Sequence, residues 1–375
     1  MMRILHVVTL VSDNGAFGGP LRVALNDLDE LQRRGHKVQL IAGWAGAGPA
    51  PDNVEGVPAK LFPVRALMPG TGFSGLVSPR LTRYVNAKAG DFDIVHVHLG
   101  RDLITQLVVK GLRQATVPYV VQTHGMLPPK TSVLARAWDA LLTAPSLRGA
   151  ARRYVLTDRE EAELSQRYGG LGLIRLPNGV RRPGGQRTPA LPPEVLYVAR
   201  LHARKRPVAF VEMAARLIAE GTVARFVMVG PDEGELAAVQ RKISELGVSR
   251  QVQYEGALPY GEVVSRMRRA SVYVLPSVDE PFPMTMLEAM SIGLPSVCTD
   301  SCGLAPRLLV AKSALVTTQA VDDLAQAVSE VLADEGLAAA LSAAAIRAID
   351  EEYSISAICD QLEADYRNVT ESAPS

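Results

Sequence analysis

A cluster of positive charges follows one strand-like segment in the second half of the sequence. Residues 200–206 read Arg-Leu-His-Ala-Arg-Lys-Arg and come directly after the apolar run Val195–Ala199. Arginine forks and a lysine ammonium suit a diphosphate, because a single cation cannot neutralise its charge. A solvated basic turn is the alternative explanation, but ligands of open α/β sheets collect where the strands end. The pattern therefore favours a diphosphate-binding site.

Two glutamates, Glu280 and Glu288, lie on either side of a loop-to-helix transition. Pro281 and Pro283 fix the loop and predict that a helix begins near Met284-Thr285, with Glu288 in its first or second turn. The first N–H groups of such a helix have no intrahelical acceptor and can bind an anion. Carboxylates beside that anion accept hydrogen bonds from sugar hydroxyls. Either glutamate alone would be explained by a capping or surface role, but the pair indicates a binding site.

A glycine-rich loop, Gly15-Ala16-Phe17-Gly18-Gly19-Pro20-Leu21-Arg22, follows the apolar run Ile4–Leu10 and opens a predicted helix. Glycines let the backbone approach a ligand closely, and the helix N-terminus offers free N–H groups and partial positive charge. The loop is not G-x-G-x-x-G, and no acidic residue ends a second strand near Leu40-Ile41. A nicotinamide dinucleotide site is therefore disfavoured. A purely structural turn before a helix would explain this loop on its own.

Two patterns that suggest metal binding lack the context that their chemistry needs. Asp91-Phe92-Asp93 matches the D-x-D of metal-dependent sugar transferases, but it precedes the predicted strand Ile94–Leu99, so we expect a loop. His96 and His98 share one face of that strand, and no third ligand is spaced to complete a zinc site. Core or cleft-lining histidines are the more common explanation.

The elements that would position these residues alternate between strand and helix, and they do so twice. This order predicts the α/β class, with a parallel sheet covered by helices in each of two domains. A first helix is expected from about Gly19, with Pro20 in its first turn and Gly35 after its end. The expected strands are Ile4–Leu10, Val38–Ala42, Ile94–Leu99, Tyr119–Gln122, Tyr154–Leu156, Val195–Ala199, Phe226–Val229, Val252–Tyr254, Val272–Leu275 and Ser296–Thr299.

A turn-rich segment separates the two series of elements. It begins with Leu176-Pro177-Asn178-Gly179-Val180 and continues to Pro193. The expected domains are therefore 1–182 and 183–354, and two such domains facing each other would hold one ligand cleft between them. Apolar residues at helical spacing in 355–369 predict a terminal helix that docks elsewhere, with residues 355–375 returning to the first domain as one option.

Composition excludes several classes of protein. The 375 residues suit two domains of roughly 150 residues, and 47% hydrophobic with 21% charged residues describes a packed globular chain. A net charge of +1 gives no global field for nucleic acid, and three cysteines without C-x-x-C form no disulfide framework. The N-terminal apolar run lacks a signal cleavage site, and no stretch approaches the roughly 20 apolar residues of a membrane span. We expect a cytoplasmic protein, at most peripheral to the inner membrane face.

Charge is distributed unevenly between the two halves. Residues 1–180 hold 21 Lys+Arg against 14 Asp+Glu, whereas the remainder holds 19 against 25. Scatter between two solvated surfaces explains this difference adequately. A basic face for an anionic lipid surface, or for a pyrophosphate-bearing acceptor, is the sharper alternative.

Taken together, these patterns resemble the GT-B glycosyltransferases of family GT4, the retaining group that uses nucleotide sugars. The resemblance covers nearly the whole chain, and the order and spacing of its motifs make it specific. The matching elements are Gly18-Gly19-Pro20-Leu21-Arg22, Val95-His96-Val97-His98, Gln122-Thr123-His124-Gly125, Pro177-Asn178-Gly179-Val180, Arg200 with Lys205, Val229-Gly230-Pro231, and Glu280 with Glu288-Ala289-Met290.

The resemblance implies two doubly wound Rossmann-like domains that face a central cleft, with most of the donor in the C-terminal domain. It implies that Arg200 and Lys205 bind the donor diphosphate, that Glu288 binds the ribose, and that Glu280 contacts the transferred sugar. The amides after Phe282, those of Met284 and Thr285, would bind the sugar or phosphate. One departure is that Pro281 and Pro283 stand where glycines are frequent, which removes two N–H donors.

For the N-terminal domain, the resemblance implies that Gly18 and Gly19 close on the diphosphate and that His124 touches the sugar at the reaction centre. It also implies that neither a metal nor a cofactor is needed besides the nucleotide-sugar co-substrate. Charge develops on the leaving β-phosphate oxygen, where cations and helix amides stabilise the transition state. Retention then implies a same-face displacement in which the leaving phosphate helps to deprotonate the acceptor.

The acceptor remains open at this stage. A cell-surface polysaccharide or glycolipid built at the cytoplasmic membrane face is the leading hypothesis, and a soluble small molecule is its close variant. A non-catalytic two-domain sugar-binding protein is a different class, although it would normally carry a secretion signal and need no cationic loop. A GT-B-like epimerase or phosphorylase is a third hypothesis, which acceptor-dependent release of nucleoside diphosphate would distinguish.

Overall fold

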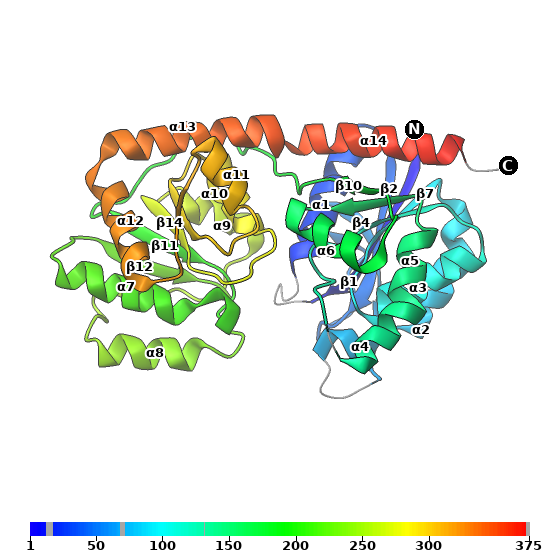
Figure 1. Cartoon of the computed structure of the whole chain (residues 1–375), viewed down its shortest axis with the longest axis horizontal. Coiled ribbons are helices and arrows are strands. Elements are labelled where there is room, and N and C mark those ends of the chain that lie inside the picture. Colours follow the sequence, from blue (N-terminus) through cyan, green and yellow to red (C-terminus); the bar gives the residue numbers. More distant parts are fainter. Residues whose placement is uncertain (13–17, 68–71, 131, 373–375) are drawn as a thin grey trace. The chain divides into compact units, whose positions relative to one another are not determined.

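The computed structural model (Figure 1) describes residues 1–12, 18–67, 72–130 and 132–372. The chain divides into two compact units, one of Met1–Gly179 with Ile355–Ser375 and one of Val180–Ser354. Each unit has a largely parallel sheet with helices on both faces, which confirms the expected α/β class with two doubly wound domains. The division after residue 179 compares with an expected boundary after residue 182.

The sheet of the first unit is built from eight described strands. They are β1 (Arg3–Val11), β2 (Lys37–Trp44), β3 (Asn53–Val54), β4 (Val57–Pro63), β7 (Ile94–His98), β8 (Tyr119–Gln122), β9 (Arg152–Val155) and β10 (Leu173–Arg175). Their order is β10-β9-β8-β7-β1-β2-β4-β3, and only the β3–β4 pair is antiparallel. The order runs outward from β1 in one direction and from β7 in the other. The topological switch point, where α/β sheets bind ligands, therefore lies between β1 and β7.

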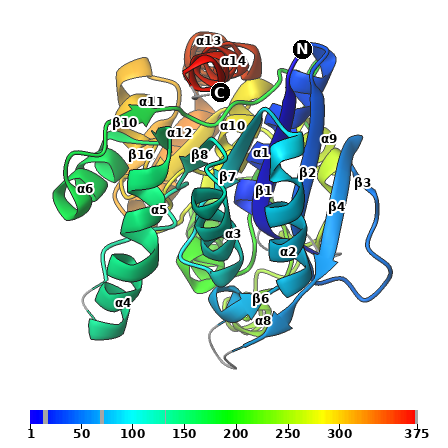
Figure 2. The same ribbon diagram turned by 90° about the vertical axis from the view of Figure 1, so that its right-hand side faces the viewer.

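Helices cover both faces of this sheet. They are α1 (Gly18–Arg33), α2 (Pro79–Lys88), α3 (Leu103–Gln114), α4 (Val133–Trp138), α5 (Ala144–Gly149), α6 (Asp158–Tyr168) and α14 (Ile355–Glu371). One buried cluster joins α1 and α14 to residues such as Ile4, Val8 and Ile94, so the terminal helix does return to the first domain. A second cluster joins α2, α3, α5 and α6 to the alternate residues Leu5 and Val7. Figure 2 shows α2 and α3 side by side.

The sheet of the second unit has six described strands, all parallel to their neighbours. They are β11 (Glu194–Val198), β12 (Arg225–Val229), β13 (Val252–Tyr254), β14 (Val272–Leu275), β15 (Ser296–Thr299) and β16 (Leu315–Thr317), in the order β13-β12-β11-β14-β15-β16. The switch point of this sheet lies between β11 and β14, whose carboxyl ends precede the basic run and the two glutamates.

The helices of this unit are α7 (Pro207–Ala219), α8 (Leu236–Glu245), α9 (Tyr260–Met267), α10 (Met284–Ser291), α11 (Ala305–Ala311), α12 (Val321–Ala333) and α13 (Glu335–Glu352). Helices α7, α8 and α12 pack in one buried cluster against Val195, Val272 and Val274. The alternate strand residue Tyr273 bonds Thr285 of α10, so α10 covers the opposite face. The prolines at 281 and 283 correctly predict where α10 begins, because they exclude helix before residue 284.

Most expected strands occur at the predicted residues, and β8, β13, β14 and β15 match them to the residue. Of the strands in the two large sheets, β3, β4, β10 and β16 were not expected. Strand β9 also begins two charged residues early, because Arg152 and Arg153 join the ladder with β8 through their backbones. The Arg153 guanidinium then donates to carbonyl oxygens, at 2.8 Å in the case of Leu171. A backbone ladder forms irrespective of the charge of its side chains, so apolar runs underestimate strand length.

The Pro177-Asn178-Gly179-Val180 motif lies where the chain leaves the first unit. A Cβ on Gly179 would stand 2.8 Å from Ile355 Cα, so only glycine allows the start of α14 to approach this closely. Asn26 Nδ2 donates to the Gly179 carbonyl over 3.1 Å, which anchors the motif to α1. Asp91 ends a 3₁₀ turn and Asp93 pairs with Arg3, so the D-x-D match is a structural loop, as expected.

Candidate active site

The basic run after β11 forms a defined turn at the carboxyl edge of the second sheet. Leu201 is fully buried and bridges Asp232 in the loop after β12. Residues Ala203–Lys205 form a 3₁₀ turn that the His202 side chain caps by accepting from the Arg204 amide over 3.1 Å. This geometry turns the Lys205 side chain inward and leaves the other cations of the run more exposed.

Lys205 and Glu280 meet in this edge. The Lys205 ammonium donates to Glu280 Oε2, and Arg204 Nη2 lies 3.6 Å from the same oxygen. Both Lys205 and Glu280 are 8% exposed. Burial lowers the pKa of Lys205, and the Glu280 carboxylate opposes that shift by attracting the proton. The sequence pattern predicted each residue at the site separately, and it gave no sign of the pairing.

A glycine from another loop holds the segment that carries Glu280. Gly303 N–H donates to the Glu280 carbonyl over 2.8 Å. A Cβ on Gly303 would stand 1.9 Å from the Pro281 carbonyl oxygen, so no other residue fits there. The Phe282 ring packs at 6.1 Å from the Tyr353 ring, and Phe282 is buried. Phe282 thus supports the loop by packing, and Gly303 is a site position that the sequence analysis missed.

Helix α10 begins with free backbone donors, as expected. Its N-cap residue, Pro283, offers no side-chain cap, and the amides of Met284 and Thr285 have no acceptor among the described residues. The Thr285 hydroxyl is already engaged, because it hydrogen-bonds Tyr273 Oη over 2.7 Å. Glu288 lies one turn later on the helix and is buried. The N-terminus of α10 therefore presents amides, rather than the Thr285 hydroxyl, for an anion.

Arg200 has a carboxylate partner that the sequence did not suggest. Its Nη1 lies 2.7 and 2.8 Å from the two carboxylate oxygens of Glu233, in the loop after β12. Gly230 makes this close approach of loops possible, since a Cβ there would stand 1.9 Å from the Ala199 carbonyl oxygen. An anion that binds Arg200 must share or displace Glu233. The close approach of Gly230 to Ala199 is the structural basis of the Val229-Gly230-Pro231 motif.

In the first unit, His124 follows β8 in a strained and tightly held loop. Its φ of 52° lies in the left-handed region, which a non-glycine residue rarely adopts. The buried Glu160 carboxylate holds the loop by accepting from Thr123 Oγ1 and Gly125 N, both over 2.5 Å. Burial raises the pKa of Glu160, and these hydrogen bonds oppose the shift. Glu160 is a second position that sequence reasoning missed, because it lies on α6.

The His124 side chain is neutral at physiological pH. It is 8% exposed, and burial lowers its pKa to about 3. Its Nε2 lies 2.6 Å from His98 Nδ1, so the H-x-H motif on β7 touches the predicted reaction-centre histidine directly. A neutral imidazole at this position does not repel positive charge that develops on a sugar ring.

The glycine-rich loop is described only in part, because residues 13–17 lie outside the described range. Gly18 and Gly19 open α1, and a Cβ on Gly19 would meet no atom within 4 Å. Arg22 in the next turn pairs with Glu55, over 2.6 Å between Nη2 and Oε1. Gly19 is therefore not required by local packing.

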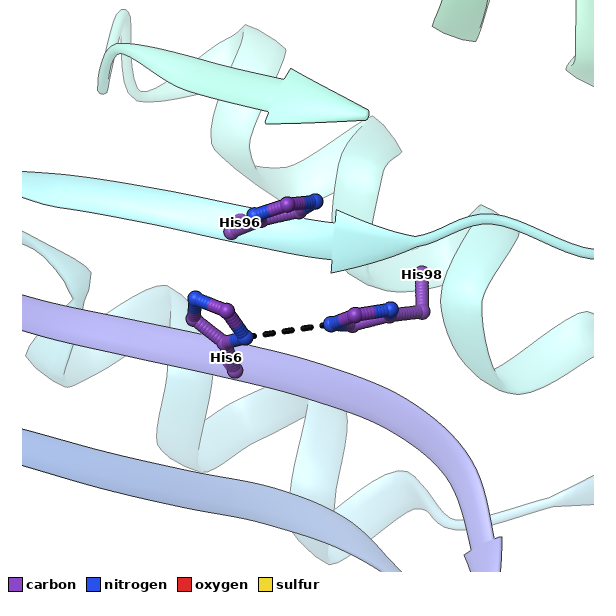
Figure 3. Close-up of side chains that lie close together, drawn as sticks. All are labelled: His6, His96 and His98. Carbon is purple, nitrogen blue, oxygen red and sulfur yellow. Dashed lines mark hydrogen bonds between the residues drawn. The ribbon is translucent and has the colours of Figure 1, made fainter. Parts of the chain in front are cut away.

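The histidines of β7 do have a third neighbour, contrary to expectation. His6 on β1 pairs in register with His96, and nitrogens of His6, His96 and His98 all lie within 4.8 Å of one another (Figure 3). The sequence could not reveal this, because strand register rather than spacing along the chain brings His6 to the other two.

Family models match both units of the chain. The model described as glycosyl transferases group 1 matches residues 185–348, and that of the glycosyl transferase 4-like domain matches residues 18–179. The chain belongs to the GT4-type glycosyltransferases. This confirms the family resemblance of the sequence motifs, and the GT4-type protein has the GT-B fold.

Several glycosyltransferases of known name are similar in sequence. The D-inositol 3-phosphate glycosyltransferase of Rhodococcus jostii is 26% identical over 397 residues, which cover 95% of this chain and 86% of that one. That of Streptomyces bingchenggensis is 27% identical over 279 residues, 67% of this chain, and the match spans only 61% of that protein. The 2-deoxystreptamine glucosyltransferase of Streptomyces kanamyceticus is 28% identical over 267 residues, which cover 64% and 68% of the two chains.

Solved structures share the fold over nearly the full length. Sucrose-phosphate synthase of Thermosynechococcus elongatus superposes with a TM-score of 0.79 at 19% identity, covering 99% of this chain and 100% of that one. The HepE protein of Anabaena, determined with UDP and glucose, gives a TM-score of 0.77 at 18% identity, covering 97% and 99%. Among the described residues, no helix of the GT4-type protein is both long and apolar enough to cross a membrane.

Proposed function

We propose that this protein transfers a sugar from a nucleoside-diphosphate sugar to an acceptor hydroxyl, with retention of anomeric configuration. The observation that carries the proposal is the switch point of the second sheet. There, Lys205 and Arg200 lie after β11, while the uncapped amides of α10 lie after the neighbouring strand β14. Cations and helix N-terminal dipoles on adjacent strand ends suit a diphosphate.

The chemistry follows from where charge develops. As the glycosidic bond to the donor breaks, negative charge grows on the β-phosphate oxygen and positive charge grows on the sugar ring. Lys205, Arg200 and the amides of Met284 and Thr285 stabilise the leaving phosphate. Glu280 and the neutral His124 tolerate the positive sugar, and Glu288 holds the ribose. The leaving phosphate takes the acceptor proton on the face from which it departs, which accounts for retention without a covalent intermediate.

This scheme requires that Lys205 exchanges partners. In the structure its ammonium pairs with Glu280, and Arg200 pairs with Glu233. A bound diphosphate supplies stronger anionic oxygens to both cations and leaves the Glu280 carboxylate available for the sugar. The Glu280 carboxylate thus helps to keep Lys205 charged before the donor arrives. This is useful at Lys205, where burial alone would favour the uncharged amine.

A small polyhydroxylated molecule is the acceptor that the relatives support best. The similar proteins are named for D-inositol 3-phosphate and 2-deoxystreptamine, both ring compounds with several hydroxyl groups. The related fold of HepE was determined with UDP and with UDP-glucose, which makes uridine diphosphate sugars the first donors to test. These names support a choice of substrates for the experiment and nothing narrower.

The test combines binding and turnover. UDP-, GDP-, ADP- and TDP-sugars are screened for thermal stabilisation, since a ligand at 100 times its Kd adds about 2.7 kcal/mol. Release of nucleoside diphosphate is then measured with inositol 3-phosphate, 2-deoxystreptamine and water as acceptors, and NMR of the product gives its anomeric configuration. Stabilisation with no acceptor-dependent release would identify a sugar-binding protein instead, and an inverted product would exclude the same-face displacement.

A membrane-bound glycolipid or polysaccharide precursor is the second candidate acceptor. The specific observation is helix α4, none of whose residues is buried, with Val133 and Leu134 exposed by 72% and 84%. Leu141 beyond the helix is 75% exposed, and the exposed cations Lys130 and Arg136 flank the apolar residues. Apolar side chains beside basic ones suit an anionic bilayer surface, in line with the basic excess of residues 1–180.

A further inference from the structure

Four of the six histidines in the sequence gather in the first unit, and the proposed reaction uses only one of them. His6 lies on β1, His96 and His98 lie on β7, and His124 follows β8. His6, His96 and His98 are completely buried. His6 and His96 each lie two residues after Ile4 and Ile94, and therefore on the same face of their strands. Ile4 and Ile94 belong to the cluster under α1 and α14, so these histidines point toward the face that α14 covers.

A continuous chain of hydrogen bonds connects His124 to Tyr366 on α14. His124 Nε2 lies 2.6 Å from His98 Nδ1, and His98 Nε2 lies 3.1 Å from His6 Nδ1 (Figure 3). His6 Nε2 then lies 3.2 Å from the Tyr366 hydroxyl. That hydroxyl also contacts His96 Nδ1 over 2.6 Å, and His96 Nε2 has no partner among the described residues.

The hydrogen bonds of this chain all point the same way, from donor to acceptor, because the imidazoles in it are neutral. Burial lowers the pKa of His6, His96 and His98 well below the usual value, and that of His124 to about 3. Each imidazole therefore carries one N–H and one bare nitrogen, so every hydrogen bond in the chain runs the same way. If the direction reverses, the proton of His124 moves from one ring nitrogen to the other.

The single proton of Tyr366 decides this direction. Hydrogen bonds that a hydroxyl donates are shorter than those that an N–H donates, so Tyr366 donates across the 2.6 Å contact to His96 and accepts from His6 across 3.2 Å. His6 then accepts at Nδ1 from His98 Nε2. His98 in turn accepts at Nδ1 from His124 Nε2. This leaves Nδ1 of His124 without a proton.

A shared metal ion is the other arrangement that three histidines suggest. A metal bound to imidazole lies in the plane of the ring, along the nitrogen lone pair. The rings of His96 and His98 are parallel within 2° and stacked, with centroids 4.7 Å apart, so no point lies in both ring planes. Since His6 and His98 also point their nitrogens at each other, the geometry favours the hydrogen-bonded chain (Figure 3).

We propose that Tyr366 sets the tautomer of His124 through His98 and His6, and so keeps His124 Nδ1 as a hydrogen-bond acceptor for a hydroxyl of the migrating sugar. The inference rests on the proposed function only for the position of His124 at the sugar. Tyr366 is a positioning residue, which acts on the substrate through three rings. The terminal helix α14 thereby becomes part of the catalytic apparatus of the first unit as well as of its core.

The experiment uses Tyr366→Phe in the full chain, with Tyr154→Phe as the matched control. Tyr154 is also buried and also bonds α14, since its hydroxyl donates to Asp365 over 3.0 Å, but it is not a member of the chain. Nitrogen NMR of histidine-labelled protein distinguishes protonated from bare ring nitrogens. We expect a bare Nδ1 on His124 in the wild type and in Tyr154→Phe. In Tyr366→Phe we expect that Nδ1 to become protonated, because His6 Nε2 loses its acceptor.

Turnover gives the second measurement. With the donor that stabilises the protein, Tyr366→Phe should lower kcat about tenfold or more while the Kd for the free nucleoside diphosphate stays unchanged. Tyr154→Phe should retain kcat within about twofold. Equal losses of kcat in both variants would show that Tyr366 only holds α14 in place, and would overturn the proposal.

Three other results would also overturn it: a protonated Nδ1 in wild-type His124, a wild-type tautomer or wild-type kcat in Tyr366→Phe, or a tightly held zinc ion that a chelator removes. Failure of the proposed function is a separate outcome, because it is recognised by the absence of wild-type turnover with every donor. The NMR measurement still decides the tautomer of His124 in that case.

Discussion

Lys205 and Glu280 form a buried ion pair between two loops that follow neighbouring parallel strands, β11 and β14. Pairing with Glu280 helps to keep Lys205 charged at a position where burial lowers its pKa. The pair lies next to the free amides of α10. A buried pair contributes little net stability against an apolar replacement, but removing one partner leaves an uncompensated charge. The pair is therefore better explained by ligand binding than by folding.

The ion pair predicts a specific order of stabilities. Lys205→Met leaves the buried Glu280 carboxylate with only the more exposed Arg204 guanidinium, 3.6 Å away. It should lower the free energy of unfolding, by less than the about 3–5 kcal/mol of a fully uncompensated buried charge. The double variant Lys205→Met/Glu280→Gln removes both charges and should be more stable than Lys205→Met alone. Urea unfolding at pH 7.5 of the wild type, of the single variants Lys205→Met and Glu280→Gln, and of the double variant measures the coupling. Additive effects of the two substitutions would contradict the pairing.

Loss of either donor cation should reduce catalysis more than it affects folding. Arg200→Ala and Lys205→Ala each remove one cation from the proposed site of the leaving diphosphate. Loss of one transition-state donor typically costs about 10²–10³-fold in rate, so we expect losses of that size in kcat/KM. Arg216→Ala on α7, whose guanidinium is half-exposed and pairs with Glu220, is the control and should leave kcat/KM unchanged. Turnover within threefold of wild type in both site variants would discard the diphosphate assignment.

Substitutions of the two glutamates, Glu280 and Glu288, should change different kinetic parameters. Glu280→Gln removes the carboxylate proposed to contact the migrating sugar and should lower kcat. Because the proposed contact of Glu280 is to the sugar, the affinity for sugar-free nucleoside diphosphate should barely change. Glu288→Ala removes the proposed ribose ligand, whose interaction is the same before and during reaction, so it should mainly raise the donor KM and weaken nucleotide binding.

Titration with nucleoside diphosphate and steady-state kinetics separate the two roles of Glu280 and Glu288. Glu288→Gln, which fills the same buried space, controls for a cavity at this position. If Glu280→Gln lost nucleotide affinity and Glu288→Ala kept it, the assignments would be reversed. No change in any parameter would place the donor site elsewhere.

Much of the architecture could be predicted because fully buried parallel strands are apolar runs that end at polar residues. Arg200 was found because it directly follows the apolar run Val195–Ala199, and Glu280 because prolines mark the loop-to-helix transition beside it. Their partners were not, since Glu233 and Gly303 come from other loops and are ordinary residue types in ordinary contexts. A carboxylate near a cation in space leaves no periodic pattern in the sequence.

The histidine chain illustrates the same limit in the first unit. His96 and His98 stand out in the sequence because they are two residues apart on one strand. His6 and Tyr366 do not stand out, because they are 90 and 270 residues away from His96 in the sequence. The β1–β7 register brings His6 to His96, and the return of α14 brings Tyr366 there. Hydrophobic pattern predicts which face of a strand is buried, but it does not predict which residues of two strands are opposite each other.

The exposed apolar residues of α4 predict a salt-dependent membrane contact. Leu134→Asp should reduce binding to vesicles that contain anionic lipid, because it removes an 84% exposed apolar side chain and adds a like charge. Each basic residue near the surface contributes about 1 kcal/mol, so binding should also weaken at high salt. Val310→Asp on α11 is the control, since Val310 is 83% exposed in the second unit. Vesicle binding that does not change with salt concentration, or that both variants lower equally, would show that the uneven charge of the two halves has no role in membrane binding.

A buried carboxyl group on α1 predicts a stability effect with a defined pH dependence. Asp27 is 1% exposed, and neither of its carboxyl oxygens has a hydrogen-bond partner among the described residues. Burial raises the pKa of Asp27 well above 3.8. Folding therefore takes up a proton at pH values between the unfolded-state and the folded-state pKa of this group. The native state binds more protons than the unfolded state, so the stability contributed at this position falls as the pH rises above 3.8.

Asp27→Asn has nearly the same shape but carries no ionisable group, so it should stabilise the fold increasingly as the pH rises. The gain should grow by about 1.4 kcal/mol per pH unit until the pH reaches the folded-state pKa, where it becomes constant. Urea unfolding at pH 5.5, 6.5 and 7.5 gives this difference, and the other titrating groups cancel between the two proteins. Asp29→Asn on the same helix, whose more exposed carboxylate pairs with Arg33, should change stability by less than about 0.5 kcal/mol at every pH. A gain for Asp27→Asn that stayed the same at all three pH values would place the folded-state pKa of this carboxyl group below 5.5 and contradict a large effect of burial.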